Sequence, residues 1–280
     1  MMPAEINKSA APQDEAGIAR GDGGAATRQT KSGNPTAAIL IIGNEILSGR
    51  TQDVNVQFIA QRLAALGIRL QEVRVVPDIA ARIIGAVNEL RAAYTMLFTT
   101  GGIGPTHDDI TSECIAAAFG VPWELHEETD AEMKAHMGER YNEARQRMAT
   151  MPRGAVPIRN EASIAPGFTI GNVHVMAGVP RIMQSMLKAL EPQLPRGEAI
   201  QMRAVHGMGV MEGGIAAGLS AIQDRFPQLD LGSYPFKRDG GWGVALVAKG
   251  TDLPAIEAAI IEATALIRAQ GVEPVQGEPA

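Results

Sequence analysis

The run TMLFTTGGIGPTHDDIT, residues Thr95 to Thr111, decides the fold that the sequence predicts. It joins a short β-rich run to a glycine-rich turn, and the apolar helical pattern ITSECIAAAFG follows at once. Strand, turn and helix in this order form the repeating unit of parallel α/β sheets, whose ligands bind at the carboxyl ends of the strands. The run therefore predicts both the architecture and the place of a site.

The segments on either side repeat this unit. Upstream, TAAILIIG and IRLQEVRVV are typical of strands, and each precedes an amphipathic helical pattern, VNVQFIAQRLAALG and IAARIIGAVNELRAAY. Downstream, EETDAEMKAHMGERYNEARQRMATM predicts one long polar helix ended by Pro152. FTIGNVHVMAG then predicts a hairpin that turns at Gly171-Asn172. Together these patterns predict an α/β domain over residues 35–194 with three layers (α/β/α) and a mostly parallel sheet.

A second, smaller unit is expected over residues 195–275, after a linker marked by Pro192 and Pro195. Its patterns run strand, helix, strand, strand, helix, which is the order of a small α+β domain with its helices on one face. The first 34 residues hold no aromatic residue and no apolar run, and they predict a disordered tail.

Composition excludes several classes of protein. The 280-residue chain has a formal net charge of −6 and only 4% aromatic residues, which argues against a nucleic-acid partner. No apolar run approaches the ~20 residues of a membrane-spanning helix, so no membrane partner is expected. The one cysteine, Cys114, cannot form a disulfide within the chain, which favours a cytoplasmic location.

The glycine-rich turn carries the chemistry most clearly. Closely spaced glycines let several backbone N–H groups converge on an anion, and the start of the next helix adds a positive dipole end. The candidate phosphate-binding and acidic residues of this run are Gly101, Gly102, Gly104, Thr106, Asp108, Asp109 and Thr111. In the simpler interpretation the glycines only make a turn and Asp109 only caps the helix.

Two other loops should lie at the same edge of the sheet. GNEILSGRTQDVN, after the first strand, offers Glu45, Asp53 and Asn55, although Asp53 could simply cap the following helix. AGVP, after the hairpin, offers Gly178 for close backbone approach and Pro180 for the first helical turn. We expect the three loops to form one site.

The runs GNEILSGRTQDVN, TTGGIGPTHDDIT, NEASIAPGF (Asn160 to Phe168) and AGVP resemble the molybdopterin-binding (MoaB/Mog-like) domain. They are most similar to the version in competence/damage-inducible protein A (CinA) and in the N-terminal part of eukaryotic FAD synthase. In the second unit, GMGVMEGGIA and GSYP are similar to the small KH-type domain of that family. The resemblance implies binding of a phosphorylated pterin or a nucleotide diphosphate, with Asp53 and Asp109 at the positions that matter for catalysis.

These observations favour a metal-dependent pyrophosphatase that hydrolyses a nucleotide diphosphate such as ADP-ribose or FAD. Asp53 and Asp109 would hold a divalent metal ion (Mg²⁺, Mn²⁺ or Co²⁺), and Glu45 or Asp108 would orient the attacking water. One alternative is molybdopterin binding or adenylyl transfer in molybdenum cofactor biosynthesis, because the same turn would serve it. Another is a nucleotide-binding module without turnover, since Ala177 and Ile182 depart from the family pattern. The sequence also leaves a homo-oligomer open.

Overall fold

The computed structural model describes residues 33–238 and 241–279, so nearly all of the predicted tail lies outside the described residues. Asn34, the last residue of that prediction, is bonded to the backbone of Glu198. Its side-chain nitrogen donates to the carbonyl at 2.7 Å, and its side-chain oxygen accepts from the N–H at 3.1 Å. Two hydrogen bonds therefore fix Asn34 against the backbone of Glu198.

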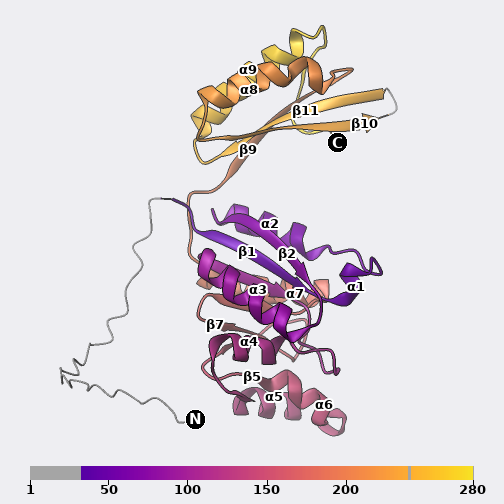
Figure 1. Ribbon diagram of the computed structural model, residues 1–280, viewed down its shortest axis with the longest axis vertical. Coiled ribbons are helices and arrows are strands. Elements are labelled where there is room, and N and C mark those ends of the chain that lie inside the picture. Colours follow the sequence, from indigo (N-terminus) through magenta and orange to yellow (C-terminus); the bar gives the residue numbers. More distant parts are fainter. Residues whose placement is uncertain (1–32, 239–240, 280) are drawn as a thin grey trace, which may run out of the picture. The chain divides into compact units, whose positions relative to one another are not determined.

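The helices and strands alternate along most of the chain (Figure 1). The strands are β1 (Thr36–Ile42), β2 (Arg69–Val76), β3 (Met96–Thr100), β4 (Trp123–Leu125), β5 (Thr150–Pro152), β6 (Val156–Ile158), β7 (Gly167–Ile170), β8 (Val173–Met176), β9 (Gln201–Met208), β10 (Asp230–Arg238), β11 (Gly241–Gly250) and β12 (Val275–Gln276). The α-helices are α1 (Asn44–Leu47), α2 (Asn55–Ala65), α3 (Ala80–Ala93), α4 (Thr111–Phe119), α5 (Glu127–Met137), α6 (Glu143–Gln146), α7 (Pro180–Leu190), α8 (Glu212–Arg225) and α9 (Leu253–Arg268). Short 3-10 turns are η1 (Gly138–Arg140), η2 (Arg147–Ala149) and η3 (Glu191–Gln193).

The large sheet has six strands in the order β2-β1-β3-β8-β7-β6. Its first four strands run parallel, and β7 pairs antiparallel with both β8 and β6. The β7–β8 hairpin turns at Gly171, whose φ of 55° is the left-handed conformation that favours glycine. The predicted mostly parallel sheet and its hairpin are confirmed.

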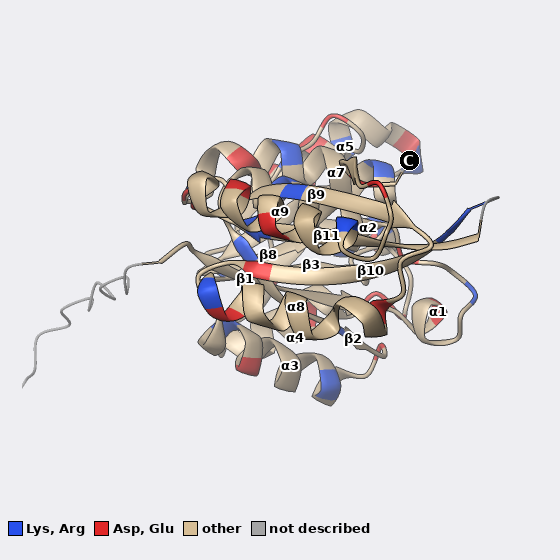
Figure 2. Ribbon diagram, turned by 90° about the horizontal axis from the view of Figure 1, so that it is seen from above, with Lys and Arg blue, Asp and Glu red and all other residues tan. Residues whose placement is uncertain are grey.

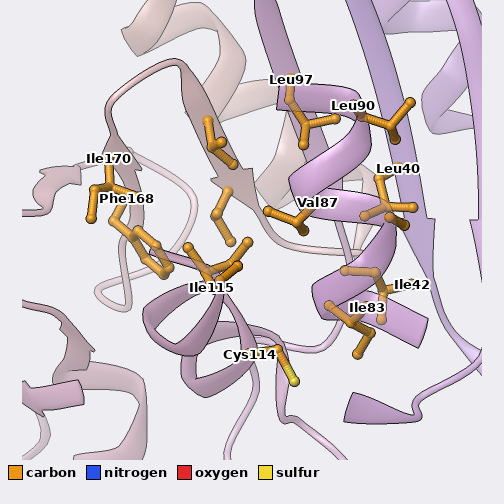
Figure 3. Packing of buried hydrophobic residues seen from close by; sticks show 14 of the residues in the cluster. Leu40, Ile42, Ile83, Val87, Leu90, Leu97, Cys114, Ile115, Phe168 and Ile170 are labelled. Atoms are coloured by element: carbon orange, nitrogen blue, oxygen red, sulfur yellow. The ribbon is translucent and has the colours of Figure 1, made fainter. Parts of the chain in front are cut away.

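Both faces of this sheet are covered, which explains the continuous apolar run of β1. Alternate side chains of a strand point to opposite faces, so Leu40 and Ile42 pack with α3 and α4 while Ile39 and Ile41 pack with α2 and α7. Figure 3 shows the first of these two layers, with Ile115 of α4 beside Phe168. The three-layer architecture that the sequence predicts is therefore confirmed.

The prediction of one long polar helix before Pro152 is wrong. Helix α5 ends at Met137. The next residue, Gly138, has a φ of 54°, which is incompatible with a right-handed α-helix. The chain then makes the short pieces η1, α6 and η2 and enters β5, where Pro152 pairs with Trp123 of β4. The result is a small two-stranded sheet, β4–β5, which stands apart from the large one.

The second unit contains a four-stranded antiparallel sheet in the order β10-β11-β9-β12. Helices α8 and α9 bury Ile222 and Ile256 against it in a separate hydrophobic core with Val205 of β9. The predicted α+β class is confirmed, while strand β12 was not expected. The proposed boundary between residues 194 and 195 stays a prediction.

Charge and hydropathy add two observations. Lys and Arg are interspersed with Asp and Glu along the helices (Figure 2). Within residues 33–238 and 241–279, no helix has the length and apolar character needed to cross a membrane.

Candidate functional site

Three parallel strands end side by side at one edge of the large sheet. Ile41 of β1 pairs with Thr100 of β3, and Thr100 pairs with Met176 of β8. The loops that leave these strands begin at Gly43, Gly101 and Ala177. The three loops that the sequence analysis selected therefore meet at the carboxyl ends of the strands, where open α/β sheets bind ligands.

The glycine turn after β3 requires glycine at two positions. Gly101 and Gly102 have φ values of 99° and 68°, in the region that side chains rarely adopt. An added Cβ would stand 2.2 Å from the Ile42 carbonyl oxygen at Gly101 and 2.1 Å from the Thr111 hydroxyl at Gly102. The turn is therefore packed against both the end of β1 and the start of α4.

Thr111 fixes this turn from inside the protein. Its hydroxyl donates to the carbonyl of Gly101 at 3.0 Å, and its N–H donates to the carbonyl of Gly102 at 3.0 Å. The side chain is fully buried. The Thr111 side chain therefore holds the turn in shape, and its predicted contact with a ligand stays a prediction.

The turn presents backbone N–H groups that can bind an anion. The N–H of Gly101 donates to the Met176 carbonyl at 3.2 Å, whereas those of Gly102, Ile103 and Gly104 donate to no group within the described residues. Consecutive free N–H groups in a glycine turn form a concave site for phosphate or carboxylate oxygens. Helix α4 begins directly after this loop and places its positive end nearby.

A first hollow lies between the three loops and brings together six of the predicted site residues. Its walls come from the end of β1, the α1–α2 loop, the glycine turn and the start of α7. The predicted residues that line it are Glu45, Asp53, Asn55, Gly101, Gly178 and Pro180. The backbone is close here, since a Cβ on Gly178 would stand 3.3 Å from the Gly101 Cα.

Asn55 gives the first hollow an unsatisfied oxygen. The side chain is 4% exposed, and its Nδ2 donates to the Gly178 carbonyl at 2.8 Å. That bond identifies the nitrogen, because a carbonyl can only accept. Within the described residues the Oδ1 atom is buried and has no partner. Buried polar atoms are nearly always paired, so this oxygen marks a place for a donor or a cation.

The two carboxylates of the first hollow are held differently. Asp53 Oδ1 accepts from the N–H of Val56 at 2.9 Å, so Asp53 caps the start of α2 in addition to lining the hollow. Glu45 folds back over Gly43, where an added Cβ would stand 2.6 Å from its Oε2 atom. Both residues line the same hollow as Asn55.

Asp109 belongs to a second hollow, on the α4 side of the turn. This hollow is lined by Ile103, Gly104, Asp109, Ser112, Trp123, Arg147, Met148, Thr150, Pro166 and Phe168. Asp109 Oδ2 accepts from the N–H of Thr106 at 2.8 Å and faces its hydroxyl at 2.5 Å. The simpler interpretation of Asp109 as a cap of α4 is therefore wrong, because its carboxylate bonds back to the loop.

Thr106 and Asp108 lie exposed at the tip of the loop. The Thr106 hydroxyl lies 2.6 Å from Asp108 Oδ1, and this hydrogen bond lowers the pKa of the Asp108 carboxyl below its ordinary value. Both side chains remain accessible to a ligand that rests on the turn.

The predicted metal pair is divided between the two hollows. Asp53 lines the first and Asp109 the second. Within residues 33–238 and 241–279, no three His, Cys, Asp or Glu side chains come together as metal ligands. The arrangement favours Glu45, rather than Asp109, as the second carboxylate beside Asp53, with Asn55 Oδ1 as a neutral oxygen.

Sequence reasoning missed Arg147 and Trp123, which line the second hollow together with Ile103 and Gly104 of the glycine turn. Arg147 fell inside the predicted long helix, and Trp123 fell between two predicted helices. Arg147 lies in the insertion between β4 and β5 (residues 123–152), and an arginine there was the available signal. Only the tertiary fold brings it into the lining of the same hollow as Gly104.

Comparisons with known proteins agree with this fold. Residues 38–196 match the family model for a probable molybdopterin binding domain, and residues 206–276 match the model for the middle domain of FAD synthase. The chain belongs to the molybdopterin-binding domain family, and a CinA-like protein is among its relatives.

Three matches show how similar the chain is to other proteins. A protein of Pyrobaculum calidifontis is 36% identical over 212 residues, which covers 72% of this chain and 81% of the relative. The CinA-like protein of Desulfovibrio desulfuricans is 32% identical over 231 residues, which covers 79% of this chain but 54% of that longer protein. The crystal structure of CinA from Thermoplasma acidophilum, a protein with unknown function, aligns with a TM-score of 0.54 and 33% identity over 57% of this chain and 98% of that one.

Proposed function

We propose that this protein is a metal-dependent pyrophosphatase that hydrolyses the diphosphate linkage of a nucleotide such as ADP-ribose or FAD. The observation that carries the proposal is the first hollow, where two carboxylates and an unpartnered amide oxygen adjoin the glycine turn. A diphosphate needs both features, because its oxygens require N–H donors and its charge requires a counterion.

The glycine turn would bind and orient the phosphates. The N–H groups of Gly102, Ile103 and Gly104, which donate to no described group, would bond to phosphate oxygens. Asp108 and Asp109 lie beside these N–H groups, and their negative charge would repel a phosphate that has no counterion. Their presence therefore favours a ligand whose charge is partly neutralised by a cation.

The residues of the first hollow fit a hard divalent cation. Asp53, Glu45 and Asn55 Oδ1 supply oxygen atoms only, which are the ligands that Mg²⁺ and Mn²⁺ prefer. The cation, when bound, would neutralise charge on the phosphate oxygens and lower the pKa of a bound water. Glu45 is half-exposed and would orient the attacking water and accept its proton.

The test is the release of AMP. The purified full chain is incubated with ADP-ribose or FAD in the presence of Mg²⁺, Mn²⁺ or Co²⁺, and the products are separated by chromatography. We expect AMP with at least one cation and none after chelation. No AMP from either substrate with any of the three cations would reject the pyrophosphatase.

Two variants and a matched control locate the site. Asp53→Asn should abolish AMP formation, and Glu45→Gln should lower its rate by about a hundredfold or more. Asp252→Asn is the control, because Asp252 Oδ1 accepts from the N–H of Ala255 at 3.1 Å in the same capping geometry. Asparagine also caps helices, so both Asp→Asn variants should stay folded. Full activity of Asp53→Asn would show that the reaction occurs elsewhere.

Binding of a phosphorylated pterin is the second candidate, favoured by the family match over residues 38–196. The same turn would hold the pterin phosphate, and the Asn55 oxygen would accept from a ring N–H. A molybdopterin titration monitored by calorimetry separates the two. Tight binding without AMP formation would favour pterin handling or adenylyl transfer, and binding of nucleotides without turnover would leave a non-catalytic module.

A further inference from the structure

Arg147 lies in the second hollow with a guanidinium that is only partly satisfied. It opens the 3-10 turn η2, and its Cζ stands 5.1 Å from the centre of the Trp123 ring. Within the described residues its Nε atom is buried and has no hydrogen-bond partner. A buried guanidinium N–H without an acceptor is costly unless something binds it.

Trp123 is a fixed platform for this arginine. The indole Nε1 lies 3.0 Å from both the Ser112 hydroxyl and the Thr150 carbonyl, which are its acceptors. The Ser112 hydroxyl in turn donates to the Thr150 carbonyl at 2.9 Å. These bonds connect α4 to β5 and hold the ring in one place. A guanidinium that stacks on such a ring presents its edge N–H groups outward in a defined plane.

The charge of Arg147 is not neutralised by the carboxylate in the same hollow. Asp109 lines that hollow as well, but no ion pair within 4.0 Å joins it to Arg147, and Asp109 Oδ2 already accepts from Thr106. Arg153, the residue directly after β5, provides the contrast, because its guanidinium pairs with Glu124 at 2.7 Å. Arg153 therefore has a carboxylate partner, whereas Arg147, which lines the same hollow as Gly104, has none within the described residues.

We propose that Arg147, stacked on Trp123, binds a phosphate group of the ligand that rests on the glycine turn. The N–H groups of Gly102 to Gly104 would approach this group from one side and the guanidinium edge from the other. This inference rests on the proposed class of ligand, a phosphorylated small molecule, and does not depend on hydrolysis. It also gives the β4–β5 insertion a role in recognition, because that insertion carries both Arg147 and Trp123.

Trp123 reports on its own site once the second tryptophan is removed. The chain has two tryptophans, and Trp242 is exposed in the other sheet, so Trp242→Phe leaves Trp123 as the source of emission. In this background inorganic pyrophosphate is titrated, with Trp123 fluorescence and calorimetry as parallel readouts. We expect saturable binding that changes the Trp123 emission.

Substitutions then identify the group that binds. Arg147→Gln should weaken pyrophosphate binding by about tenfold or more, since it removes a charge-assisted hydrogen bond. Arg147→Lys should retain part of the affinity, because it keeps the charge but loses the planar fork. The matched control is Arg153→Gln, which removes the same charge from the residue directly after the insertion and should leave the affinity unchanged.

Several outcomes would overturn the proposal. The first is that the parent does not bind pyrophosphate, and the second is that Arg147→Gln leaves the dissociation constant unchanged. The third is that Arg153→Gln loses as much affinity as Arg147→Gln, which would indicate a general charge effect. If thermal unfolding shows that Arg147→Gln does not fold, Arg147→Lys decides, and an affinity equal to that of the parent rejects the subsite. Normal pyrophosphate binding without AMP formation would reject the pyrophosphatase alone.

Discussion

The Thr111 hydroxyl donates a hydrogen bond to the Gly101 carbonyl at 3.0 Å, and through it helix α4 fixes the turn that follows β3. Both residues are buried, so water cannot replace the bond. The shape of the candidate phosphate-binding turn therefore depends on a buried side chain of the helix that follows it.

Replacing this hydroxyl by a methyl group should weaken the protein measurably. Thr111→Val is nearly isosteric but leaves the Gly101 carbonyl without its donor, so we expect a loss of about 1–3 kcal/mol in the free energy of unfolding. Urea denaturation measures the change. Thr264→Val is the control, because its hydroxyl donates to the Ile260 carbonyl within helix α9. An equal, small loss in both variants would contradict a special role for Thr111.

Gly102 should tolerate no side chain. Alanine there would combine a φ of 68° with a Cβ 2.1 Å from the Thr111 hydroxyl. Gly49→Ala separates the two effects, since Gly49 has a φ of 71° and nothing within 4 Å of its Cβ position. We expect about 1 kcal/mol for Gly49→Ala and clearly more for Gly102→Ala, measured by urea denaturation. Equal losses would show that the turn can move away from Thr111.

Cys114 should react with thiol reagents only when the protein unfolds. Its side chain is 3% exposed, and burial raises the pKa of the thiol to about 11, so the thiolate is scarce at pH 8. Labelling with a chromogenic disulfide reagent should be slow in buffer and should rise with urea along the unfolding curve. Ser220→Cys in a Cys114→Ser background places a thiol at an exposed position and should react at once. Rapid native labelling of Cys114 would reveal an opening of the α3–α4 layer.

His174 should make stability depend on pH. It packs against Phe98 with ring centres 5.0 Å apart, and burial lowers its pKa from 6.5 to about 4. The unfolded chain therefore takes up a proton near pH 6.5 that the folded chain takes up only near pH 4. The free energy of unfolding should fall by about 3 kcal/mol as the pH drops between these values.

Denaturation at several pH values in the variants His174→Gln and His136→Gln tests this. The first should lose the pH dependence, and the second should keep it because His136 is exposed. The same slope in both variants would assign the effect to other groups.

The sequence predicted the large sheet well because its signals are local and periodic. Leu40 and Ile41 point to opposite faces and both are buried, which only a sheet covered on two sides provides. The same logic predicted the meeting of Glu45, Asp53 and Asn55, since the carboxyl ends of parallel strands share an edge.

The sequence could not predict which hollow each acidic residue lines. The direction of the Asp109 carboxylate depends on its bonds to Thr106 within an irregular loop. The break at Gly138 was missed because an isolated glycine within a polar helical pattern is often tolerated, and only its φ of 54° shows the end of the helix. Because the predicted helix was too long, the position of Arg147 near the glycine turn could not be predicted.

The pairing of Trp123 with Pro152 has a consequence for how this protein can vary. The insertion between β4 and β5 begins at Trp123 and ends at Pro152. Its two ends are therefore neighbours in space. Exposed positions between these two residues can therefore be lengthened, shortened or exchanged without moving the strands on which the glycine turn depends. Ligand preference could then change, in evolution or by grafting, through substitutions in this insertion while the glycine turn that binds phosphate stays the same.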